Sequence, residues 1–270
     1  MTPGAAANPD SPASEGDARI GLGVDVGGTN IKLGLVALDT GELVGDSLYI
    51  PTPQPATPDA VASAITDAVG TMDWSGPVGV AIPSVIHKGV ARTAANIDPE
   101  WIGCDVEELF GRHLPGRTVT LLNDADAAGI TEIHFGSAKG VEGLVILLTL
   151  GTGIGSAFLF DGQLIPNTEF GHFFVPHIST GVYDEAEHYA SGAVRAVRGL
   201  SFEEWAPHLS NVLRQMENLL WPKLFVLGGG ISEAADQWVP MLENRTPVAP
   251  ATRLNDAGIV GAAIYADASA

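Results

Sequence analysis

Two glycine-rich segments with neighbouring threonines are the first features of this chain that could bind a compact anion. The first runs from Asp25 to Asn30 (DVGGTN) and the second from Leu150 to Gly155 (LGTGIG). Glycine lets several backbone amides point at one centre, and threonine and asparagine side chains add donors. Each segment lies between two apolar runs, which predicts a tight corner between two strands. One such corner is more often a plain hairpin, but two can hold a phosphate chain from opposite sides.

Neither corner matches a common nucleotide motif. A P-loop requires a lysine after its last glycine, and both the P-loop and the dinucleotide fingerprint require a following helix. A third run, Gly228-Gly229-Gly230, lies between a predicted strand and a predicted helix. It is either a phosphate-binding helix start or a plain turn. Asp25 would lie beside the phosphates, where a carboxylate makes chemical sense if Mg²⁺ lies between them, bound directly or through water.

A carboxylate follows the apolar run from Val119 to Leu122, at the point where a helix is predicted to begin. In a cleft, Asp124 could act as a general base that accepts a hydroxyl proton while a phosphoryl group arrives. It could also simply cap the helix. Asp126 competes for the role of base, but it falls in the first helical turn, where the helix dipole favours a negative charge. We therefore assign Asp126 a structural role.

Four further polar residues are of the types that hydrogen-bond sugar hydroxyls: Asn96, Glu169, His172 and Glu187. Spacing alone leaves His172 and Glu187 ambiguous, because single histidines and glutamates are more often surface residues. A zinc site at His172 is not expected, because Cys104 is the only cysteine of the chain and lies far away in the sequence.

These residues must be positioned by an α/β fold, because predicted strands and helices alternate in both halves. Strands are predicted at 20–26, 31–38, 43–50, 77–82, 119–122, 143–150, 156–160 and 224–227. Helices are predicted at 59–69, 105–113, 123–133, 202–220, 232–242 and 256–266, with an extended loop at 51–58. The glycine corner inside a strand meander occurs near the start and again near 143–165, which suggests two similar domains facing a cleft.

We expect a disordered tail at 1–18, an N-terminal α/β domain at 19–123 and a C-terminal α/β domain at 124–254. A final helix, at about 255–266, can pack back on the first domain.

Charge and composition exclude several classes of partner. The 270 residues include 13 Lys and Arg against 32 Asp and Glu, a formal net charge of −19. Nucleic acid and anionic membranes need a basic footprint, so neither is expected as a partner. The single cysteine fits a reducing compartment, and no apolar run reaches the ~18 residues of a membrane span. We expect a cytoplasmic protein.

Taken together, these motifs resemble those of the ROK family (repressor, open reading frame, kinase), and within it the actinobacterial polyphosphate glucokinases. The resemblance runs from about Gly21 to Ala266. It rests on the two glycine corners and on these further stretches: Thr52–Pro58 (TPQPATP), Thr93–Asn96 (TAAN), Leu122–Gly129 (LNDADAAG), Ile165–His172 (IPNTEFGH) and Gly228–Ser232 (GGGIS). The proline loop and the NTEFGH stretch are distinctive of the polyphosphate branch.

The resemblance implies an actin-like ATPase (ribonuclease H-like) fold, with two α/β domains around a cleft. Asp124 takes the position of the catalytic base. The sugar-binding positions are Asn96, Asn123, Glu169, His172 and Glu187. The phosphate-binding positions are Asp25, Gly27, Gly28, Thr29, Asn30, Lys32, Thr149, Gly151, Thr152, Gly153, Gly228 and Gly229. The resemblance also implies Mg²⁺ near Asp25, no zinc site, polyphosphate or ATP as donor, glucose as acceptor and a homodimer.

Three features depart from the family pattern or strain it. Ser84 follows Pro83 where the family usually has glycine, and segment 173–183 is atypical, so both can reshape the sugar pocket. The chain is also poor in basic residues for a polyphosphate track. The candidates are Lys32, Lys88, Arg92, Lys139, Arg195 and Arg198. They would have to create a local positive strip on an acidic protein.

The leading hypothesis is phosphoryl transfer from inorganic polyphosphate to the 6-hydroxyl of glucose, with ATP as a candidate additional donor. The alternative is a strictly ATP-dependent hexose kinase acting on glucose or mannose, which the acidic surface favours. A non-catalytic sugar sensor is the remote alternative, disfavoured because only a short tail-like segment precedes the first predicted strand and because the charge opposes DNA binding.

Overall fold

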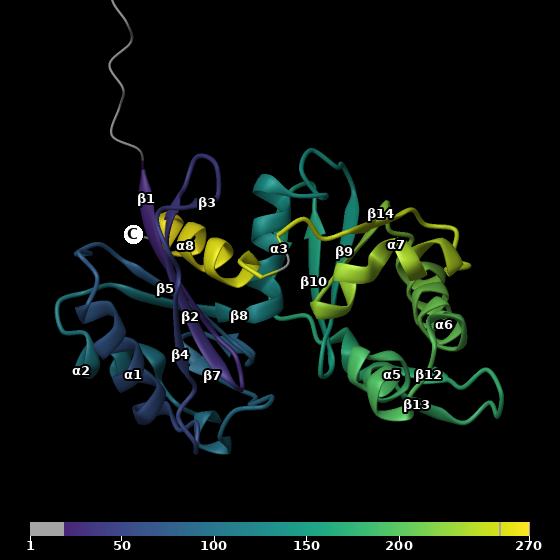
Figure 1. Ribbon diagram of the computed structural model, residues 1–270, viewed down its shortest axis with the longest axis horizontal. Coiled ribbons are helices and arrows are strands. Elements are labelled where there is room, and N and C mark those ends of the chain that lie inside the picture. The colour runs from purple at the N-terminus through teal and green to yellow at the C-terminus, as the bar shows by residue number, and fades with distance from the viewer. Residues whose placement is uncertain (1–18, 254, 270) are drawn as a thin grey trace, which may run out of the picture.

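The computed structural model describes residues 19–253 and 255–269, and the expected tail at 1–18 lies outside the described residues. The chain forms two lobes, each built around one β-sheet (Figure 1). The strands are β1 (Ile20–Val26), β2 (Asn30–Ala37), β3 (Glu42–Leu43), β4 (Leu48–Pro51), β5 (Val78–Ile82), β6 (Ile86–His87), β7 (Val90–Ala91), β8 (Val119–Asn123), β9 (Leu144–Leu150), β10 (Ile154–Phe160), β11 (Gln163–Ile165), β12 (Phe174–Pro176), β13 (Tyr183–Glu185), β14 (Leu224–Gly228) and β15 (Val248–Pro250).

The α-helices are α1 (Pro58–Gly70), α2 (Val106–His113), α3 (Asp124–Phe135), α4 (Ala186–Ala190), α5 (Gly192–Arg198), α6 (Phe202–Leu220), α7 (Ala235–Trp238) and α8 (Ala257–Ser269). Short 3₁₀ helices lie at Pro99–Trp101, Phe170–His172, Gly230–Ala234 and Val239–Met241.

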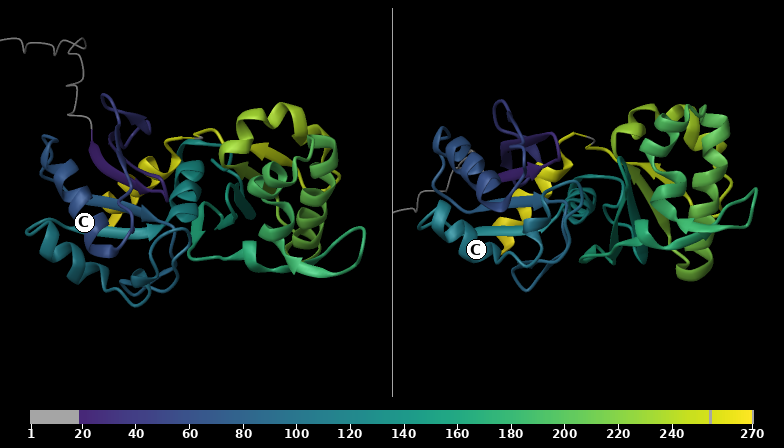
Figure 2. Two further views of the ribbon diagram at one scale, coloured as in Figure 1. Left: turned by 60° about the horizontal axis from the view of Figure 1, so that its bottom comes forward. Right: turned by 90° about the horizontal axis from the view of Figure 1, so that it is seen from below.

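The two sheets share one topology. The first has the order β3-β2-β1-β5-β8, with β4 also paired to β2, and the second has the order β11-β10-β9-β14-β15. In each sheet, three consecutive antiparallel strands form a meander. A later strand pairs in parallel with the first strand of the meander, and a further strand pairs in parallel with that later strand. The glycine corner inside a strand meander, which occurs in both halves of the sequence, is therefore part of a repeat of the whole strand order. The turned views show the two lobes side by side (Figure 2).

Helices cover both faces of each sheet because the central strands are apolar on both sides. Val61 and Ile65 of α1 pack with α2 and the sheet on one face of the first lobe, while α8 covers the other face. In the second lobe, α6 buries Trp205, Leu209 and Leu213 against β9 and β14. Its capping box at Ser201 and Glu204 satisfies the first amides of this 19-residue helix.

Glycines allow α3 and α8 to lie very close to their neighbours between the two sheets. A Cβ added at Gly79 of β5 would overlap the carbonyl oxygen of Ala262 on α8, and one at Gly261 would overlap the carbonyl oxygen of Ala127 on α3. Gly129 of α3 in turn packs against Ala157 of β10. α3 contacts both lobes and lies between them (Figure 1).

Two predicted elements are wrong in detail. The strand predicted at 43–50 is two short strands, β3 and β4, because Gly45 takes a positive φ of 81° and breaks the extended backbone. The helix predicted at 232–242 is a 3₁₀ turn, one turn of α7 and a second 3₁₀ turn that begins beside Pro240. The other predicted strands and helices are present, with shifts of a few residues at their ends.

We propose that the domains follow the two sheets, with 19–123 as the first, 124–254 as the second, and α8 returning to the first sheet. Among the described residues, no helix combines the length and the apolar character that a membrane span requires.

Candidate active site

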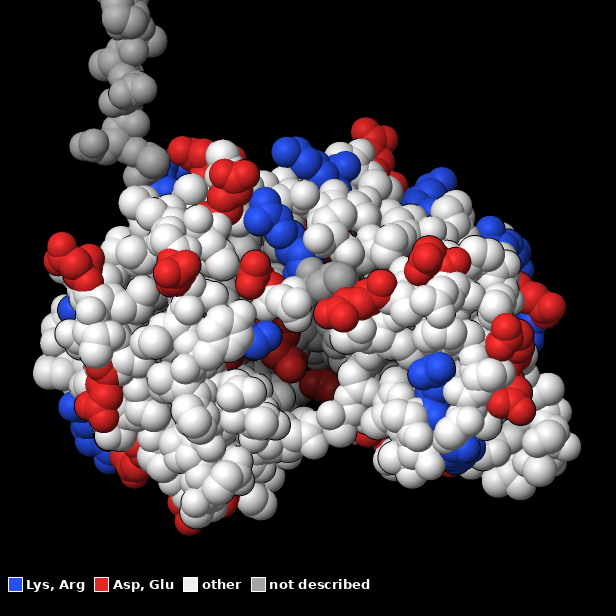
Figure 3. All heavy atoms as spheres, in the orientation of Figure 1, with Lys and Arg blue, Asp and Glu red and all other residues white. Residues whose placement is uncertain are grey.

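A cavity of about 150 Å³ lies where the two lobes meet, and residues from both lobes line it. Asp25 and Gly258 contribute from the first lobe, Thr149 and Gly228 from the second, and Asp124 from the first turn of α3. The space-filling view shows the molecule hollowed here, with acidic atoms on the floor of the hollow and basic atoms along its rim (Figure 3). The arrangement brings the candidate base together with Asp25, Thr149, Gly228 and Gly229, four of the predicted phosphate-binding residues.

Asp124 is the first residue of α3, but Asn123 caps the helix. The Asn123 Oδ1 accepts hydrogen bonds from the amides of Ala125 (2.9 Å) and Asp126 (3.2 Å), and its Nδ2 donates to the Ser84 carbonyl (3.4 Å). Capping thus falls to Asn123, which leaves the Asp124 carboxyl in the cleft with a single bond, from the Ala125 amide at 2.8 Å. Asn123 is buried and largely engaged by the protein, so little of its amide remains for a sugar.

The environment of Asp124 favours its protonated form. Solvent reaches this carboxyl through the cleft mouth, yet protein surrounds it on the other sides, and this desolvation is the main cause that raises its pKa to about 7. The negative charges of Asp25 and Glu169 raise the pKa further, and the hydrogen bond from Ala125 opposes them. A base with a pKa close to neutral pH is well matched to accept a hydroxyl proton.

Asp25 lies on β1 beside Asp124, with Lys32 of β2 as its counter-ion. The Lys32 Nζ lies 3.9 Å from the Asp25 carboxylate and donates to the Asn255 carbonyl at 3.2 Å. Burial raises the pKa of Asp25, and the Lys32 charge opposes that shift. Asp25 and Asp124 are two of the three carboxylate residues that line the cavity, with Glu132 as the third, and their oxygens are donors of the kind that Mg²⁺ prefers.

The first glycine corner is braced from outside by the proline loop. The Thr52 Oγ1 donates to the Gly27 carbonyl (2.6 Å), and the Gln54 Nε2 donates to the Gly28 carbonyl (3.1 Å). The Gly27 amide bonds to the Asn30 carbonyl, which closes the corner. Gly28 also packs against the backbone of Asn96, so the predicted sugar ligand Asn96 lies next to the predicted phosphate corner. Thr29 and Asn30 are exposed at its tip.

The second corner and the third glycine run pack on one another in the second lobe. Gly229 has a φ of 86°, and a Cβ there would lie 2.7 Å from backbone atoms of Leu150. Thr149 and Gly228 line the cavity, whereas Gly151, Thr152 and Gly153 form the adjoining turn, with Gly151 and Thr152 exposed. The structure therefore brings the second and third glycine segments together beside the cavity that Asp25, at the start of the first segment, also lines.

Glu169, His172 and Glu187 meet beside the second corner. The His172 Nε2 lies 3.8 Å from Glu169, and its Nδ1 lies 3.7 Å from Glu187. The Glu187 Oε2 also accepts a hydrogen bond from the Ile154 amide at 3.3 Å, which fixes this carboxylate beside Gly153. Burial raises the pKa of Glu169, and the charge of His172 opposes the shift.

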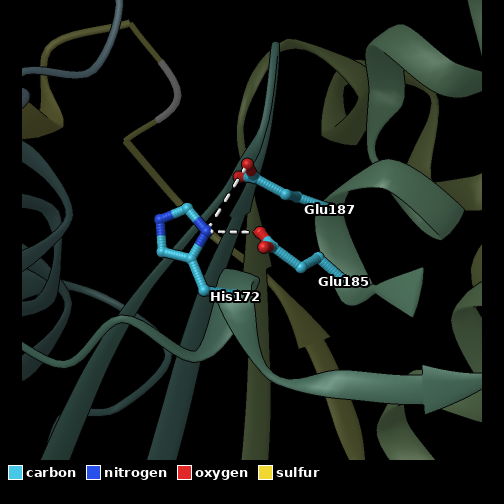
Figure 4. Close-up of side chains that lie close together, drawn as sticks. All are labelled: His172, Glu185 and Glu187. Carbon is cyan, nitrogen blue, oxygen red and sulfur yellow. Dashed lines mark hydrogen bonds and ion pairs between the residues drawn. The ribbon is translucent and has the colours of Figure 1, made fainter. Parts of the chain in front are cut away.

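Glu185 joins this cluster although its sequence context gave no signal for it. Its Oε2 lies 2.7 Å from the His172 Nδ1, and this hydrogen bond is the main cause that raises the pKa of His172 (Figure 4). One ligand atom from each of His172, Glu185 and Glu187 lies within 4.8 Å of the others. The set of one imidazole and two carboxylates differs from the cysteine-rich sets of structural zinc sites. Only an alternation of Glu, Ala and Glu at 185–187 could have pointed to Glu185.

Arg253 is a second residue that the sequence analysis missed. It lines the cavity together with Gly228 and Gly229, and its guanidinium donates to the carbonyls of Gly41 (3.0 Å) and Thr40 (3.3 Å). Among the cations proposed for a polyphosphate track, Lys32 faces the cavity region, whereas Arg195 stacks on the Phe202 ring at 3.8 Å.

The structure also shows the surroundings of Ser84 and of segment 173–183, the two expected departures from the family pattern near the sugar pocket. The Ser84 side chain is buried and donates to the Thr93 carbonyl at 2.7 Å, so it braces the loop that leads to Asn96. The atypical segment forms the hairpin β12–β13, which exposes Phe174, Ile178, Val182 and Tyr183 to solvent and places Glu185 at its end.

Comparison with known proteins gives concordant matches. The model of the ROK family matches residues 21–193. A polyphosphate glucokinase of Mycobacterium tuberculosis is 53% identical over 246 residues, which cover 91% of both chains, and that of Mycobacterium leprae is 47% identical, covering 96% of this chain and 78% of the relative.

Among solved structures, an inorganic polyphosphate/ATP-glucomannokinase from Arthrobacter sp. strain KM matches with a TM-score of 0.85 and 44% identity, over 93% of this chain and 99% of that one. A ROK family glucokinase from Streptomyces griseus, in complex with glucose and AMPPNP, matches with a TM-score of 0.74 and 25% identity, over 93% and 100%. The predicted actin-like fold is confirmed. With its family motifs, its repeated sheet topology and these matches, the chain belongs to the ROK family.

Proposed function

We propose that this chain is a phosphotransferase that moves the terminal phosphoryl group of inorganic polyphosphate to the 6-hydroxyl of glucose, giving glucose 6-phosphate. The observation that carries the proposal is the position of the Asp124 carboxyl, which shares one cavity with Asp25, Thr149, Gly228 and Gly229 and lies close enough to Glu169 for that charge to raise its pKa. The high identity to polyphosphate glucokinases over nine-tenths of the chain supports this donor and this acceptor.

In the proposed step, Asp124 accepts the proton of the glucose 6-hydroxyl as its oxygen attacks the terminal phosphorus. A new P–O bond to glucose forms while the P–O bond to the next phosphate breaks. The bonding electrons leave with the shortened polyphosphate, and the proton stays on Asp124 until solvent removes it. Because such transfers depend mainly on positioning and on charge stabilisation, the surrounding groups matter as much as the base.

We assign the remaining roles as the family resemblance implies. Asn96, Glu169, His172 and Glu187 hold the sugar hydroxyls. Asn123, whose Oδ1 caps α3, keeps only the second hydrogen of its Nδ2 for the sugar. The phosphate side consists of Gly27, Gly28, Thr29, Asn30, Lys32, Thr149, Gly151, Thr152, Gly153, Gly228 and Gly229, to which we add Arg253.

Mg²⁺ is the cofactor that the acidic floor of the cleft fits. Asp25 would hold it, directly or through water, with Asp124 nearby. When bound, the ion neutralises phosphate charge and helps to align the donor. Lys32 and Arg253 act on the same side by attracting the donor to a protein with a net charge of −19.

A second candidate is a kinase that uses ATP as donor and mannose as a further acceptor. Two matches favour it, since one solved relative is described as a polyphosphate/ATP-glucomannokinase and another was solved with AMPPNP and glucose. A sugar sensor has weaker support, because the match to a ROK transcriptional regulator, at 16% identity, shows the fold alone.

The deciding experiment measures glucose 6-phosphate formation with Mg²⁺, comparing long-chain polyphosphate with ATP at equal phosphoryl concentration. Faster turnover with polyphosphate supports the main proposal. Turnover with ATP alone would identify ATP as the donor in place of polyphosphate and would leave the proposed sugar-binding residues unchanged. Absence of turnover with either donor, on glucose and on mannose, contradicts both.

From the family resemblance we also propose a homodimer, which sedimentation tests directly. We also propose that the protein is cytoplasmic, because its single cysteine fits a reducing compartment.

A further inference from the structure

A single asparagine joins the two lobes next to the candidate sugar ligands. Asn167 lies in the loop between β11 and the 3₁₀ turn at Phe170–His172, on the side of the second sheet. Its Oδ1 accepts a hydrogen bond from the Ile86 amide (2.9 Å), and its Nδ2 donates to the Ile86 carbonyl (2.9 Å). Ile86 belongs to β6, which follows the end of β5 in the first lobe. One side chain thus satisfies both peptide groups of a residue 81 positions away.

Asp126 completes the junction from α3. Its Oδ2 accepts a hydrogen bond from the Asn167 amide at 2.8 Å, and its side chain is buried, with only 2% of the residue exposed. Asn167 itself has a φ of 60°, a left-handed conformation that asparagine adopts more readily than most residues. Backbone and side chain of this residue are therefore both held, by two different elements.

The next residues of the loop are anchored in the opposite direction, on the second sheet. The Thr168 Oγ1 donates to the Ser156 carbonyl (2.9 Å), the Ser156 Oγ donates to the Thr168 carbonyl (2.8 Å), and the Phe170 amide donates to the Ser156 Oγ (2.9 Å). Glu169 lies between Thr168 and Phe170, which are both bonded to Ser156, so its backbone is fixed to β10. Asn167, two residues earlier, ties the same loop to the first lobe.

We propose that Asn167, with Asp126, is a positioning clamp that sets the distance between the sugar ligands of the two lobes. The proposal rests on the proposed function, because it takes Glu169 and Asn96 as ligands of one sugar. A hexose must contact both sides at once, and small displacements of such groups cost much of their contribution. The phosphate-side segments at 151–153 and 228–229 take no part in the hydrogen bonds of the clamp.

The test compares glucose with polyphosphate in the steady state. Asn167→Gly removes the clamp but keeps a residue that accepts a φ of 60°, so the loss of the side chain is isolated from backbone strain. We expect the KM for glucose to rise roughly tenfold, the effect of losing hydrogen bonds that together stabilise the bound geometry, with the KM for polyphosphate within about twofold. Asn167→Asp keeps the acceptor for Ile86 and loses the donor, so its KM for glucose should fall between wild type and the glycine variant.

A matched control is Asn244→Ala, which removes another side-chain amide bonded to a backbone carbonyl, that of Thr246, with no role between the lobes. It should leave both KM values within about twofold of wild type. Asp126→Ala combined with Asn167→Gly should raise the KM for glucose by less than the product of the two single effects, because the residues act as one unit.

An unchanged KM for glucose in Asn167→Gly overturns the proposal, and so does an equal rise in both KM values or a fully multiplicative double variant. Should the glycine variant fail to fold, Asn167→Asp supports the same comparison. Equilibrium titration with glucose distinguishes a failure of the clamp from a failure of the proposed function. A wild-type protein that makes no glucose 6-phosphate contradicts the proposed function, whereas the effect of Asn167→Gly on the Kd for glucose still tests the clamp.

Discussion

The pKa of Asp124 makes the strongest prediction about the proposed reaction. A base with a pKa of about 7 is about nine-tenths ionised at pH 8 and about one-tenth ionised at pH 6. Because only the carboxylate can accept the hydroxyl proton, kcat/KM for glucose should fall roughly tenfold between these two pH values. An ordinary aspartate, with its pKa near 3.8, would give no change over this range.

Two variants locate the titration at Asp124. Asp124→Asn should lower kcat by ~10²–10⁴-fold while glucose still binds, and its residual rate should be flat between pH 6 and 8. A titrating phosphate on the donor would instead leave the same acidic limb in the variant. In the metal-free protein, Asp25→Asn should lower the pKa of Asp124, because the Asp25 charge is the second cause that raises it.

The assay samples the reaction at each pH, quenches it, and measures glucose 6-phosphate afterwards at one fixed pH, so that no coupling enzyme limits the rate. Asp126 needs its own control, since burial also raises its pKa to about 7. Asp126→Asn should keep the acidic limb. A flat wild-type profile from pH 6 to 8, or a limb that disappears in Asp126→Asn and persists in Asp124→Asn, would refute the assignment of the base.

Three further predictions concern single side chains. Glu169→Gln should raise the KM for glucose by about tenfold with little change in the KM for polyphosphate, because a charged acceptor for sugar hydroxyls is lost; equal changes in both would argue against a sugar ligand. Arg253→Ala should raise the KM for polyphosphate several-fold at low salt and less at high salt, whereas Arg214→Ala, which removes a surface pair with Glu243, should not. Gly79→Ala should lower the free energy of unfolding by about 3 kcal/mol in urea titration, because its Cβ would overlap the Ala262 carbonyl, whereas Gly70→Ala, whose Cβ meets open space, should stay within about 0.5 kcal/mol.

The sequence alone was sufficient for features that depend on local pattern. The strand–glycine–strand corners at 25–30 and 150–155, the carboxylate at the end of β8 and the amphipathic helix α6 are each encoded within a short window. Such windows carry the side-chain period and the turn residues that decide local structure. The motifs were also sufficient for the family, because several short stretches agree along nearly the whole chain.

The roles of the residues at the start of α3 could not be predicted from the local sequence. The sequence placed Asn123 and Asp124 together at a strand end and left either capping or catalysis open for Asp124. The structure gives the cap to Asn123, because its Oδ1 reaches the Ala125 and Asp126 amides. Asp126, assigned to structure from its place in the first turn, contacts the amide of a residue 41 positions away.

Only the tertiary structure decided the contacts that join distant segments. Glu185 lies against His172 because the hairpin β12–β13 folds back, and Asn167 reaches Ile86 because α3 holds the two sheets side by side. Arg253 enters the cavity because the chain returns from β15 to α8 across its rim. No regular spacing in the sequence links the residues that meet in these contacts. Each depends on how whole sheets and helices pack, and that packing is set by the close glycine contacts of α3 and α8 rather than by the residues that meet.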